Sequence, residues 1–205
     1  MEDGVEIIGR SAVYTGFLPL TQYRVRVATP GGGPGETLYR ERIEDLKAAA
    51  VLPFDPTNER IVLVKQFRIG ALGAPGGAWL LEPPGGVIDA GESPETAARR
   101  EAWEEAGCRL CPLAPILRCQ TSPGVSDECV ALYCGAVDSG SVATTGGRHG
   151  EGEWTEVVTL DLDTAIRDLG RGMLTAATLI ISVQWLAMNR RRLVALWSGG
   201  GSGPA

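Results

Sequence analysis

The feature that most constrains this chain is one helix whose two ends are both marked in the sequence. Ser93 is a good N-cap, because a serine hydroxyl accepts a hydrogen bond from a backbone N–H of the first turn, and Pro94 suits the first helical position. Gly107 is the natural stop, since glycine readily adopts the left-handed conformation that closes a helix. The sequence therefore predicts a helix over residues 94–106.

Three acidic side chains gather on one side of that helix. Glu101 and Glu105 are four residues apart and stack on one face, with Glu104 at its edge. Carboxylates crowded in this way repel each other unless a hard cation lies between them. Mg²⁺ prefers oxygen ligands, and a protein supplies only a few of them. The rest of the coordination shell comes from water and substrate phosphates. Arg100, one turn before Glu104, is expected to pair with it and orient the cluster.

A proline- and glycine-rich segment, residues 83–86, precedes the helix and is predicted to be a loop. Because glycine has no side chain, backbone carbonyls of such a loop can approach a metal. A solvated acidic helix after a glycine turn is the simpler alternative, and it would be preferred for an isolated pair of glutamates. It does not account for the whole pattern, in which Gly86 is followed at fixed intervals by Glu92 and Arg100.

This pattern resembles the Nudix box, Gly-x5-Glu-x7-Arg-Glu-aliphatic-x-Glu-Glu-x-Gly-aliphatic. Every fixed position of the box is met, with Ala102 and Cys108 in the two aliphatic positions. The resemblance implies an α/β chain with the Nudix fold, which is an α/β/α sandwich around a mixed central sheet. It implies Mg²⁺ as the cofactor, with Mn²⁺ as a substitute. The metal ligands and their supports would be Gly85, through its carbonyl, Glu101, Glu105 and Glu104, which is also a candidate catalytic residue.

Beyond the box, nearly the whole chain resembles bacterial ADP-ribose pyrophosphatases, which cleave ADP-ribose to AMP and ribose 5-phosphate. The most telling residue is Pro123, fifteen residues after the box, a placement associated with ADP-ribose specificity. Its local sequence alone also allows an ordinary turn. The resemblance further covers residues 5–8, 51–56, 66–71, 80–86 and 184–186.

By position, the resemblance places Phe17 against the adenine ring, and Arg40 and Arg68 near the base or the diphosphate. Phe17 could instead belong to the core, and Arg40 lies in a charged segment that could be solvated surface. Arg68 is the strongest of the three, because an arginine at the end of a buried strand suits bidentate phosphate recognition. The other polar groups of the substrate are assigned to Glu82, Ser122 and Glu128.

A general base is expected in the glycine-rich segment 146–153, where Glu151 and Glu153 are the candidates. Hydrolysis of a phosphoanhydride needs an activated water, and a carboxylate outside the helix would take its proton. Only one of the two carboxylates is expected to face the metals. Glu151 is favoured because it matches the family position, whereas Glu153 adjoins Trp154 and would anchor the next strand. A solvated acidic turn is the simpler alternative.

The strand pattern and the resemblance divide the chain into three parts. Residues 1–46 are predicted to form a small antiparallel sheet, with strands over 5–8, 22–28 and 37–41. Residues 47–197 form the Nudix domain, with strands over 48–52, 61–67, 130–134 and 156–160 and further helices over 162–169 and 174–196. Residues 198–205 are rich in glycine and serine and are expected to form a flexible tail. A similar enzyme swaps its N-terminal sheet between subunits, so the resemblance implies a homodimer in which Phe17 and Arg40 reach the partner's site.

Composition argues against several other classes of protein. A net charge of −6 does not suit a duplex nucleic-acid binder. The longest apolar run, 179–188, is interrupted and too short to span a membrane, and residues 1–10 resemble neither a signal peptide nor an anchor, so a cytoplasmic enzyme is expected. Cys108 and Cys111 form a CxxC pair, but zinc would need a second pair and the only histidine is His149. Buried, reduced thiols are the preferred interpretation.

Two alternatives to an ADP-ribose pyrophosphatase keep the same box. A pyrophosphatase for another nucleotide sugar, such as UDP-glucose or GDP-mannose, would differ at the residues that bind the substrate. A non-catalytic Nudix sensor would bind ADP-ribose without cleaving it, and loss of a box glutamate would signal that case. No box glutamate is lost in this sequence.

Overall fold

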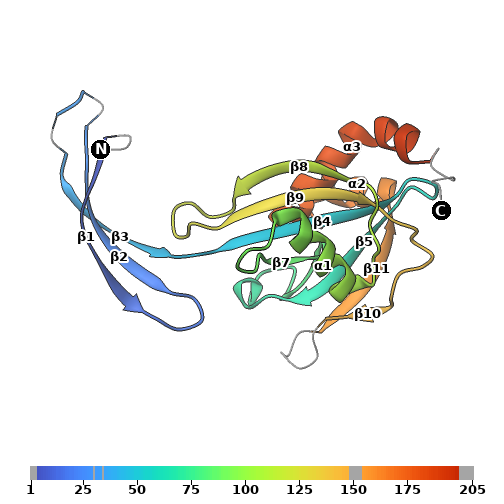
Figure 1. The fold of residues 1–205 in the computed structure, drawn as a ribbon, viewed down its shortest axis with the longest axis horizontal. Helices are drawn as coiled ribbons and strands as arrows, with labels where there is room; N and C mark the ends of the chain where they lie inside the picture. Colours follow the sequence, from blue (N-terminus) through green and yellow to red (C-terminus); the bar gives the residue numbers. More distant parts are fainter. Residues whose placement is uncertain (1–3, 30, 34, 148–153, 199–205) are drawn as a thin grey trace. The chain divides into compact units, whose positions relative to one another are not determined.

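The computed structural model describes residues 4–29, 31–33, 35–147 and 154–198. The chain folds as two units, which are described separately below (Figure 1). The first unit comprises Met1–Lys47 and Gln120–Cys129, and the second comprises Ala48–Cys119 and Val130–Ala205. The segment 120–129 therefore belongs with the N-terminal part of the chain, although it is distant from that part in sequence.

The first unit contains a small antiparallel sheet in the order β1-β2-β3, as predicted. Val25 lies opposite Ile7 on one side and Leu38 on the other, so apolar side chains share one face of the sheet. Most residues of the three strands are exposed or half-buried, and the sheet therefore has little core of its own. The strands are β1 (Val5–Tyr14), β2 (Leu20–Val27) and β3 (Thr37–Ile43).

A polar cluster stabilises the end of this sheet. The Glu44 carboxylate accepts hydrogen bonds from the Tyr23 hydroxyl, from the Thr21 hydroxyl at 2.8 Å and from the Arg42 guanidinium at 2.6 Å. These hydrogen bonds lower the pKa of Glu44 to about 2. The bond from Tyr23 has the largest effect, followed by those from Thr21 and Arg42. The ionised carboxylate is therefore strongly favoured in the folded chain.

We expect Glu44→Gln to destabilise the folded protein at neutral pH by about 1–2 kcal/mol, because hydrogen bonds to a charged group are lost from a partly solvated site. Since folding lowers the pKa of Glu44, ionised Glu44 contributes to the free energy of unfolding. This contribution is fully present above the ordinary pKa near 4.5 and is lost as the pH falls toward 2. Tm values of both proteins, measured from pH 7 to pH 3, should therefore converge at low pH. A Tm difference that does not change with pH would contradict this account.

The second unit is built on an eight-stranded sheet, whose main path is β10-β11-β5-β4-β9-β8, with β6 paired to β5 and β7 to β4. Its helices are α1 (Pro94–Ala106), α2 (Leu162–Gly170) and α3 (Ala177–Trp197), and a short 3-10 helix η1 covers Ile69–Ala71. The strands are β4 (Lys47–Asp55), β5 (Arg60–Phe67), β6 (Trp79–Glu82), β7 (Gly85–Val87), β8 (Leu113–Gln120), β9 (Cys129–Ala136), β10 (Thr145–Gly146) and β11 (Thr155–Asp161).

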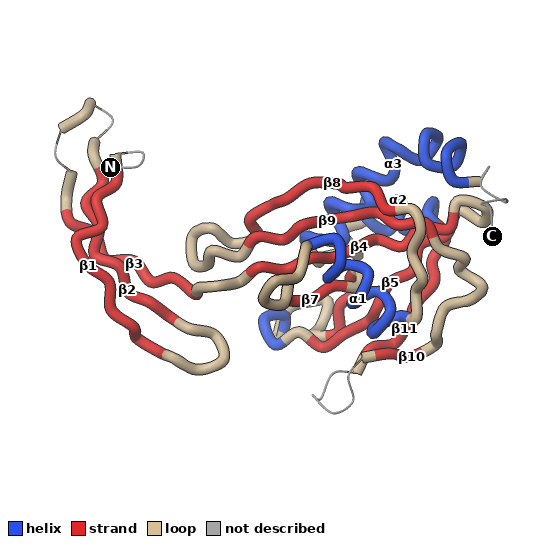
Figure 2. The backbone as a smooth tube through the Cα atoms, viewed as in Figure 1, coloured by secondary structure: helices blue, strands red, loops and turns tan. Residues whose placement is uncertain are grey.

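The sheet is mixed, as expected for the Nudix fold. At one end of β4 and β9 the Cys129 N–H donates to the Leu46 carbonyl, and at the other end the Val137 N–H donates to the Phe54 carbonyl. Both strands therefore run in the same direction. Neighbouring β5 runs antiparallel to both β4 and β11. Figure 2 shows these strands as one layer beside the helices.

Helices cover both faces of this sheet, which confirms the predicted sandwich (Figure 1). Successive strand residues point to opposite faces. Leu52 and Leu63 pack with the α2 and α3 side chains, whereas Val51 and Val62 pack against the alanines of α1. Among the described residues, none of the helices combines the length and hydropathy needed to cross a bilayer.

Several elements differ from the sequence prediction. The segment 83–86 was expected to be a loop, but Gly85 and Gly86 begin strand β7, which pairs with β4. A Cβ on Gly85 would lie 2.5 Å from the Ala50 Cβ, so this pairing depends on the small size of both residues. Strands β6, β8 and β10 were also not predicted, and α3 begins at Ala177 rather than at Leu174. Leu174 is buried in the connection before α3, which accounts for its apolar character.

Candidate active site

Helix α1 begins and ends at the predicted residues. The Ser93 hydroxyl accepts a hydrogen bond from the Thr96 N–H at 3.1 Å, and Gly107 closes the helix in the left-handed conformation. The Cys108 N–H then donates to the Ala102 carbonyl at 3.0 Å, which completes the closing turn. These local contacts fix the last turns of α1, where the acidic side chains lie.

Glu105 faces the interior and joins α1 to the glycine strand β7. It is only 4% exposed, and its carboxylate accepts a hydrogen bond from the Gly85 N–H at 2.9 Å. The neighbouring Gly86 approaches Glu101 so closely that a Cβ at this position would overlap the Glu101 carboxylate. The absence of a side chain at Gly86 therefore lets β7 lie directly against the acidic face of α1.

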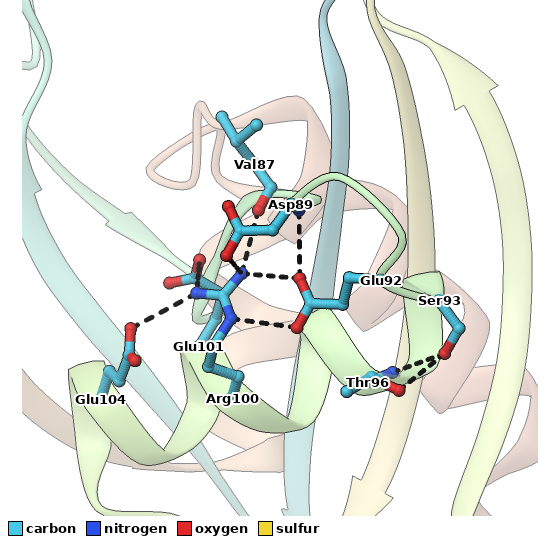
Figure 3. A network of polar contacts seen from close by, with 8 residues as sticks. All are labelled: Val87, Asp89, Glu92, Ser93, Thr96, Arg100, Glu101 and Glu104. Atoms are coloured by element: carbon cyan, nitrogen blue, oxygen red, sulfur yellow. Dashed lines mark hydrogen bonds and ion pairs between the residues drawn. The ribbon is translucent and has the colours of Figure 1, made fainter.

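Arg100 connects the carboxylates of this site (Figure 3). It forms a bidentate pair with Glu92, in which both hydrogen bonds are 3.0 Å long. It also donates to Glu101 at 2.7 Å and to Glu104 at 3.4 Å. A further hydrogen bond, to the Val87 carbonyl, is 3.0 Å long. The predicted pair with Glu104 is thus present, but the closer partners are Glu92 and Glu101. Hydrogen bonding to Glu92 is the main cause that raises the pKa of Arg100, and the same contact lowers the pKa of Glu92. Arg100 therefore stays charged and orients three acidic side chains.

The donor atoms gathered here suit a hard divalent cation. They are oxygens only: the carboxylates of Glu101, Glu104 and Glu105, beside the backbone of Gly85. Within the described part of the chain, no three His, Cys, Asp or Glu side chains lie together in an arrangement that could hold a metal ion as it stands. Because Gly86 has no Cβ, the Glu101 carboxylate can lie directly against the backbone of β7.

The two ends of the segment that carries Glu151 and Glu153 are bound to α1. The Gly147 N–H donates to the Glu104 carbonyl at 3.1 Å. The hydroxyl of Thr155, which is buried, donates to the Glu105 carbonyl at 3.0 Å. Glu151 and Glu153 themselves lie outside the described residues. The residues on either side of the segment are therefore fixed beside the last turn of α1.

Arg68 and Glu82 lie together in the second unit. The Arg68 Nε lies 2.7 Å from a Glu82 carboxylate oxygen, and the arginine is the more exposed of the two side chains. Glu82 is opposite Val64 in the ladder between β5 and β6, so it shares the face of the sheet that α1 covers. Two residues predicted separately for substrate binding are therefore an ion pair on the same side of the sheet as the acidic cluster.

The remaining predicted substrate residues lie in the first unit. Phe17 is 95% exposed, so the alternative that it belongs to the core of this chain is wrong. Arg40 is exposed on β3, where its guanidinium donates to the Tyr39 carbonyl at 2.8 Å. Ser122 and Glu128 share the turn between β8 and β9, and the Glu128 carboxylate accepts a hydrogen bond from a hydroxyl of the same turn.

Sequence reasoning missed Gln66 and Thr155 as residues near the site. They lie opposite each other in the ladder between β5 and β11. Gln66 is 6% exposed, and its side-chain oxygen has no hydrogen-bond partner in the described part of the chain. Its position next to Thr155 places it near the backbone of Glu105. The available signal was the polar pair Lys65 and Gln66 directly after the apolar run of β5.

The two cysteines of the CxxC pair, Cys108 and Cys111, differ in their exposure to solvent. Cys108 is buried, and burial raises the pKa of its thiol to about 12, whereas Cys111 is exposed. Burial also raises the pKa of Cys134. The expectation of buried thiols therefore holds for Cys108 and Cys134 and is wrong for Cys111. His149 lies outside the described residues.

Comparison with known proteins agrees with this geometry. A model of the NUDIX domain matches residues 45–174. The chain is 36% identical over 197 residues to an ADP-ribose pyrophosphatase of Escherichia coli (strain K12), covering 96% of this chain and 94% of the relative. It is 32% identical over 199 residues to an ADP-ribose pyrophosphatase of Haemophilus influenzae, covering 96% and 92%. A GDP-mannose pyrophosphatase of Cronobacter sakazakii is 32% identical over 151 residues, covering 73% and 78%. With its complete box on α1 and β7, the chain belongs to the Nudix hydrolase family.

Proposed function

We propose that this protein hydrolyses the pyrophosphate bond of ADP-ribose to give AMP and ribose 5-phosphate, with Mg²⁺ as its metal. The observation that supports this substrate most is similarity along the whole chain, since two ADP-ribose pyrophosphatases each align with 96% of it. The GDP-mannose pyrophosphatase aligns with only 73%. Nudix hydrolases in general need a divalent metal, and the all-oxygen donors of α1 favour Mg²⁺, with Mn²⁺ as a substitute.

The mechanism assigns a distinct task to each group of the site. A bound divalent cation would neutralise charge on the diphosphate and make a coordinated water more acidic. Glu101, Glu104, Glu105 and the Gly85 carbonyl are the groups that would hold it. Arg100 keeps the carboxylates of Glu101 and Glu104 in place and offsets their mutual repulsion. A base, for which we propose Glu151, takes the proton from the attacking water.

Recognition of ADP-ribose is assigned to side chains of both units. On substrate binding, the exposed Arg68 guanidinium would release Glu82 and bind the diphosphate instead. A guanidinium can bind phosphate oxygens in bidentate fashion. Phe17 offers a fully exposed ring on which adenine can stack. The remaining polar contacts are proposed for Arg40, Glu82, Ser122 and Glu128.

We further propose a homodimer in which the N-terminal sheet completes the neighbour's pocket. Large apolar side chains on this sheet are exposed, including Ile7, Tyr14, Phe17 and Tyr39. A three-stranded sheet with so little core gains stability by covering such a surface. Residues 1–46 would then serve dimerisation and 47–197 hydrolysis.

The dimer is tested by light scattering at the enzyme concentration used in the assay. We expect the mass of two chains, and we expect Phe17→Ala to raise KM strongly while the dimer persists, because the ring binds substrate. A monomer with full activity would contradict the proposal.

The substrate is tested by assaying the purified protein with Mg²⁺ against ADP-ribose, UDP-glucose, GDP-mannose, diadenosine polyphosphates and CoA. We expect kcat/KM for ADP-ribose to exceed that of the other nucleotide sugars by at least about tenfold, with AMP and ribose 5-phosphate released in equal amounts. Higher kcat/KM for UDP-glucose or GDP-mannose would overturn the assignment. Tight binding of ADP-ribose without product would identify a sensor instead of an enzyme.

A further inference from the structure

The turn between β8 and β9 is hydrogen-bonded to the end of β3 and to the residues that follow it. The Ile43 N–H donates to the Val125 carbonyl at 2.9 Å, and the Asp127 N–H donates back to the Ile43 carbonyl at 3.2 Å. Ile43 also pairs with Ser126 in a parallel bridge. All of these residues belong to the first unit, so the turn and the end of the N-terminal sheet form one structure.

The Asp127 side chain strengthens this connection. Its two carboxylate oxygens accept hydrogen bonds from the Asp45 and Leu46 N–H groups, each at 3.3 Å, and one of them lies 3.7 Å from the Arg42 guanidinium. Asp45 has a φ of 61°, in the left-handed region that few residues other than glycine, asparagine and aspartate adopt. The carboxylate of Asp127 therefore stabilises a left-handed backbone conformation by binding its N–H group.

This anchor determines how the rest of the turn is presented. The Ser122 carbonyl accepts hydrogen bonds from the Val125 and Ser126 N–H groups, both at 3.0 Å, so Ser122 is part of the same compact turn. Glu128 follows Asp127 directly, and its carboxylate bonds to the Thr121 hydroxyl instead of residues 45 and 46. The anchoring side chain and the proposed substrate-binding side chains thus lie within seven consecutive residues.

We propose that Asp127 is a positioning residue for substrate recognition, which holds the turn on the chain after β3 and so fixes where Ser122 and Glu128 meet the substrate. The inference rests on the proposed function, because the roles of Ser122 and Glu128 are part of it. Arg42 extends the anchor, since it also bonds to Glu44 and to the Tyr23 hydroxyl. Selection of the substrate is thereby tied to the end of the N-terminal sheet.

The test compares Asp127→Ala with Asp127→Asn in the full-length protein. We expect Asp127→Ala to raise KM for ADP-ribose about tenfold with kcat within about twofold of the wild type, because the metal-binding glutamates are not in this turn. Asparagine keeps one oxygen acceptor, so Asp127→Asn should give an intermediate KM. Glu36→Ala, which removes an exposed acid just before β3, is the matched control and should leave KM unchanged.

Tm and amide hydrogen exchange of Asp45 and Leu46 separate positioning from loss of folding. Faster exchange at these two amides together with a raised KM supports the proposal. An unchanged KM, or a fall in kcat and Tm at constant KM, overturns it. If Asp127→Ala does not fold, Asp127→Ser is judged by the same criteria, because a serine hydroxyl cannot reach both amides. A wild type that does not cleave ADP-ribose would refute the proposed function, whereas an active wild type with no KM shift in the variants refutes this inference alone.

Discussion

Glu105→Gln is expected to lower kcat by at least about 10³-fold with little change in Tm. The reason lies in the two tasks of this side chain. Its negative charge is proposed to hold the metal, while its oxygen accepts the hydrogen bond from the Gly85 N–H at 2.9 Å. A glutamine oxygen can accept the same hydrogen bond but carries no charge. The substitution therefore removes metal binding and keeps the contact between α1 and β7.

The measurement is kcat in saturating Mg²⁺, together with calorimetric titration of Mg²⁺ and a Tm for each protein. Glu95→Gln is the matched control on the same helix, since Glu95 is exposed in the first turn and pairs with Arg99. This control should keep kcat, Mg²⁺ affinity and Tm close to those of the wild type. Near wild-type turnover by Glu105→Gln would refute the assignment of the metal site.

Glu151→Gln is expected to lower kcat far more than it changes KM, while Mg²⁺ affinity is mostly kept, because a general base acts on the attacking water and not on binding. Glu153→Gln should be milder. The support for a base in this segment is that Gly147 and Thr155, on either side of it, are bound to the backbone of Glu104 and Glu105. The two flanking residues thus lie beside the backbone of the proposed metal ligands.

Single-turnover rates of both variants across pH decide between the two carboxylates. The expected result is that the dependence on a basic group seen in the wild-type pH profile disappears in Glu151→Gln and persists in Glu153→Gln. Equal losses in the two variants would indicate a shared role. A larger loss in Glu153→Gln would show that Glu153 is the base.

Local sequence signals determined the central helix and the order of its acidic residues. The limits of α1 follow from Ser93 and Gly107, which act on neighbouring backbone groups and need no tertiary contact. The relative placement of Glu101 and Glu105 follows from helical geometry alone. The box could therefore be recognised from residue type and spacing, whereas the sandwich of helices around a mixed sheet was predicted from the resemblance of this box to the Nudix family.

Long-range pairing decided what local signals could not. Gly85 and Gly86 become a strand only because β4 offers a partner with an alanine at the point of closest approach. Arg100 was expected to pair with Glu104, and it does, but its bidentate partner is Glu92 in the loop before α1. Hydrogen bonds of this kind depend on which separate segments of the chain come together in the folded protein. Local helix and turn propensities do not show this.

The sequence by itself determined which carboxylates of the proposed metal site share a face of α1, because the helical repeat fixes their relative positions. Only the tertiary structure showed that the turn with Ser122 and Glu128 belongs to the N-terminal unit. That turn is distant in sequence from residues 43–46, and the backbone groups of the two segments form hydrogen bonds only in the folded chain. The placement of the acidic residues on α1 is thus a property of local chain geometry, whereas the surroundings of the proposed substrate residues are set by contacts between remote segments.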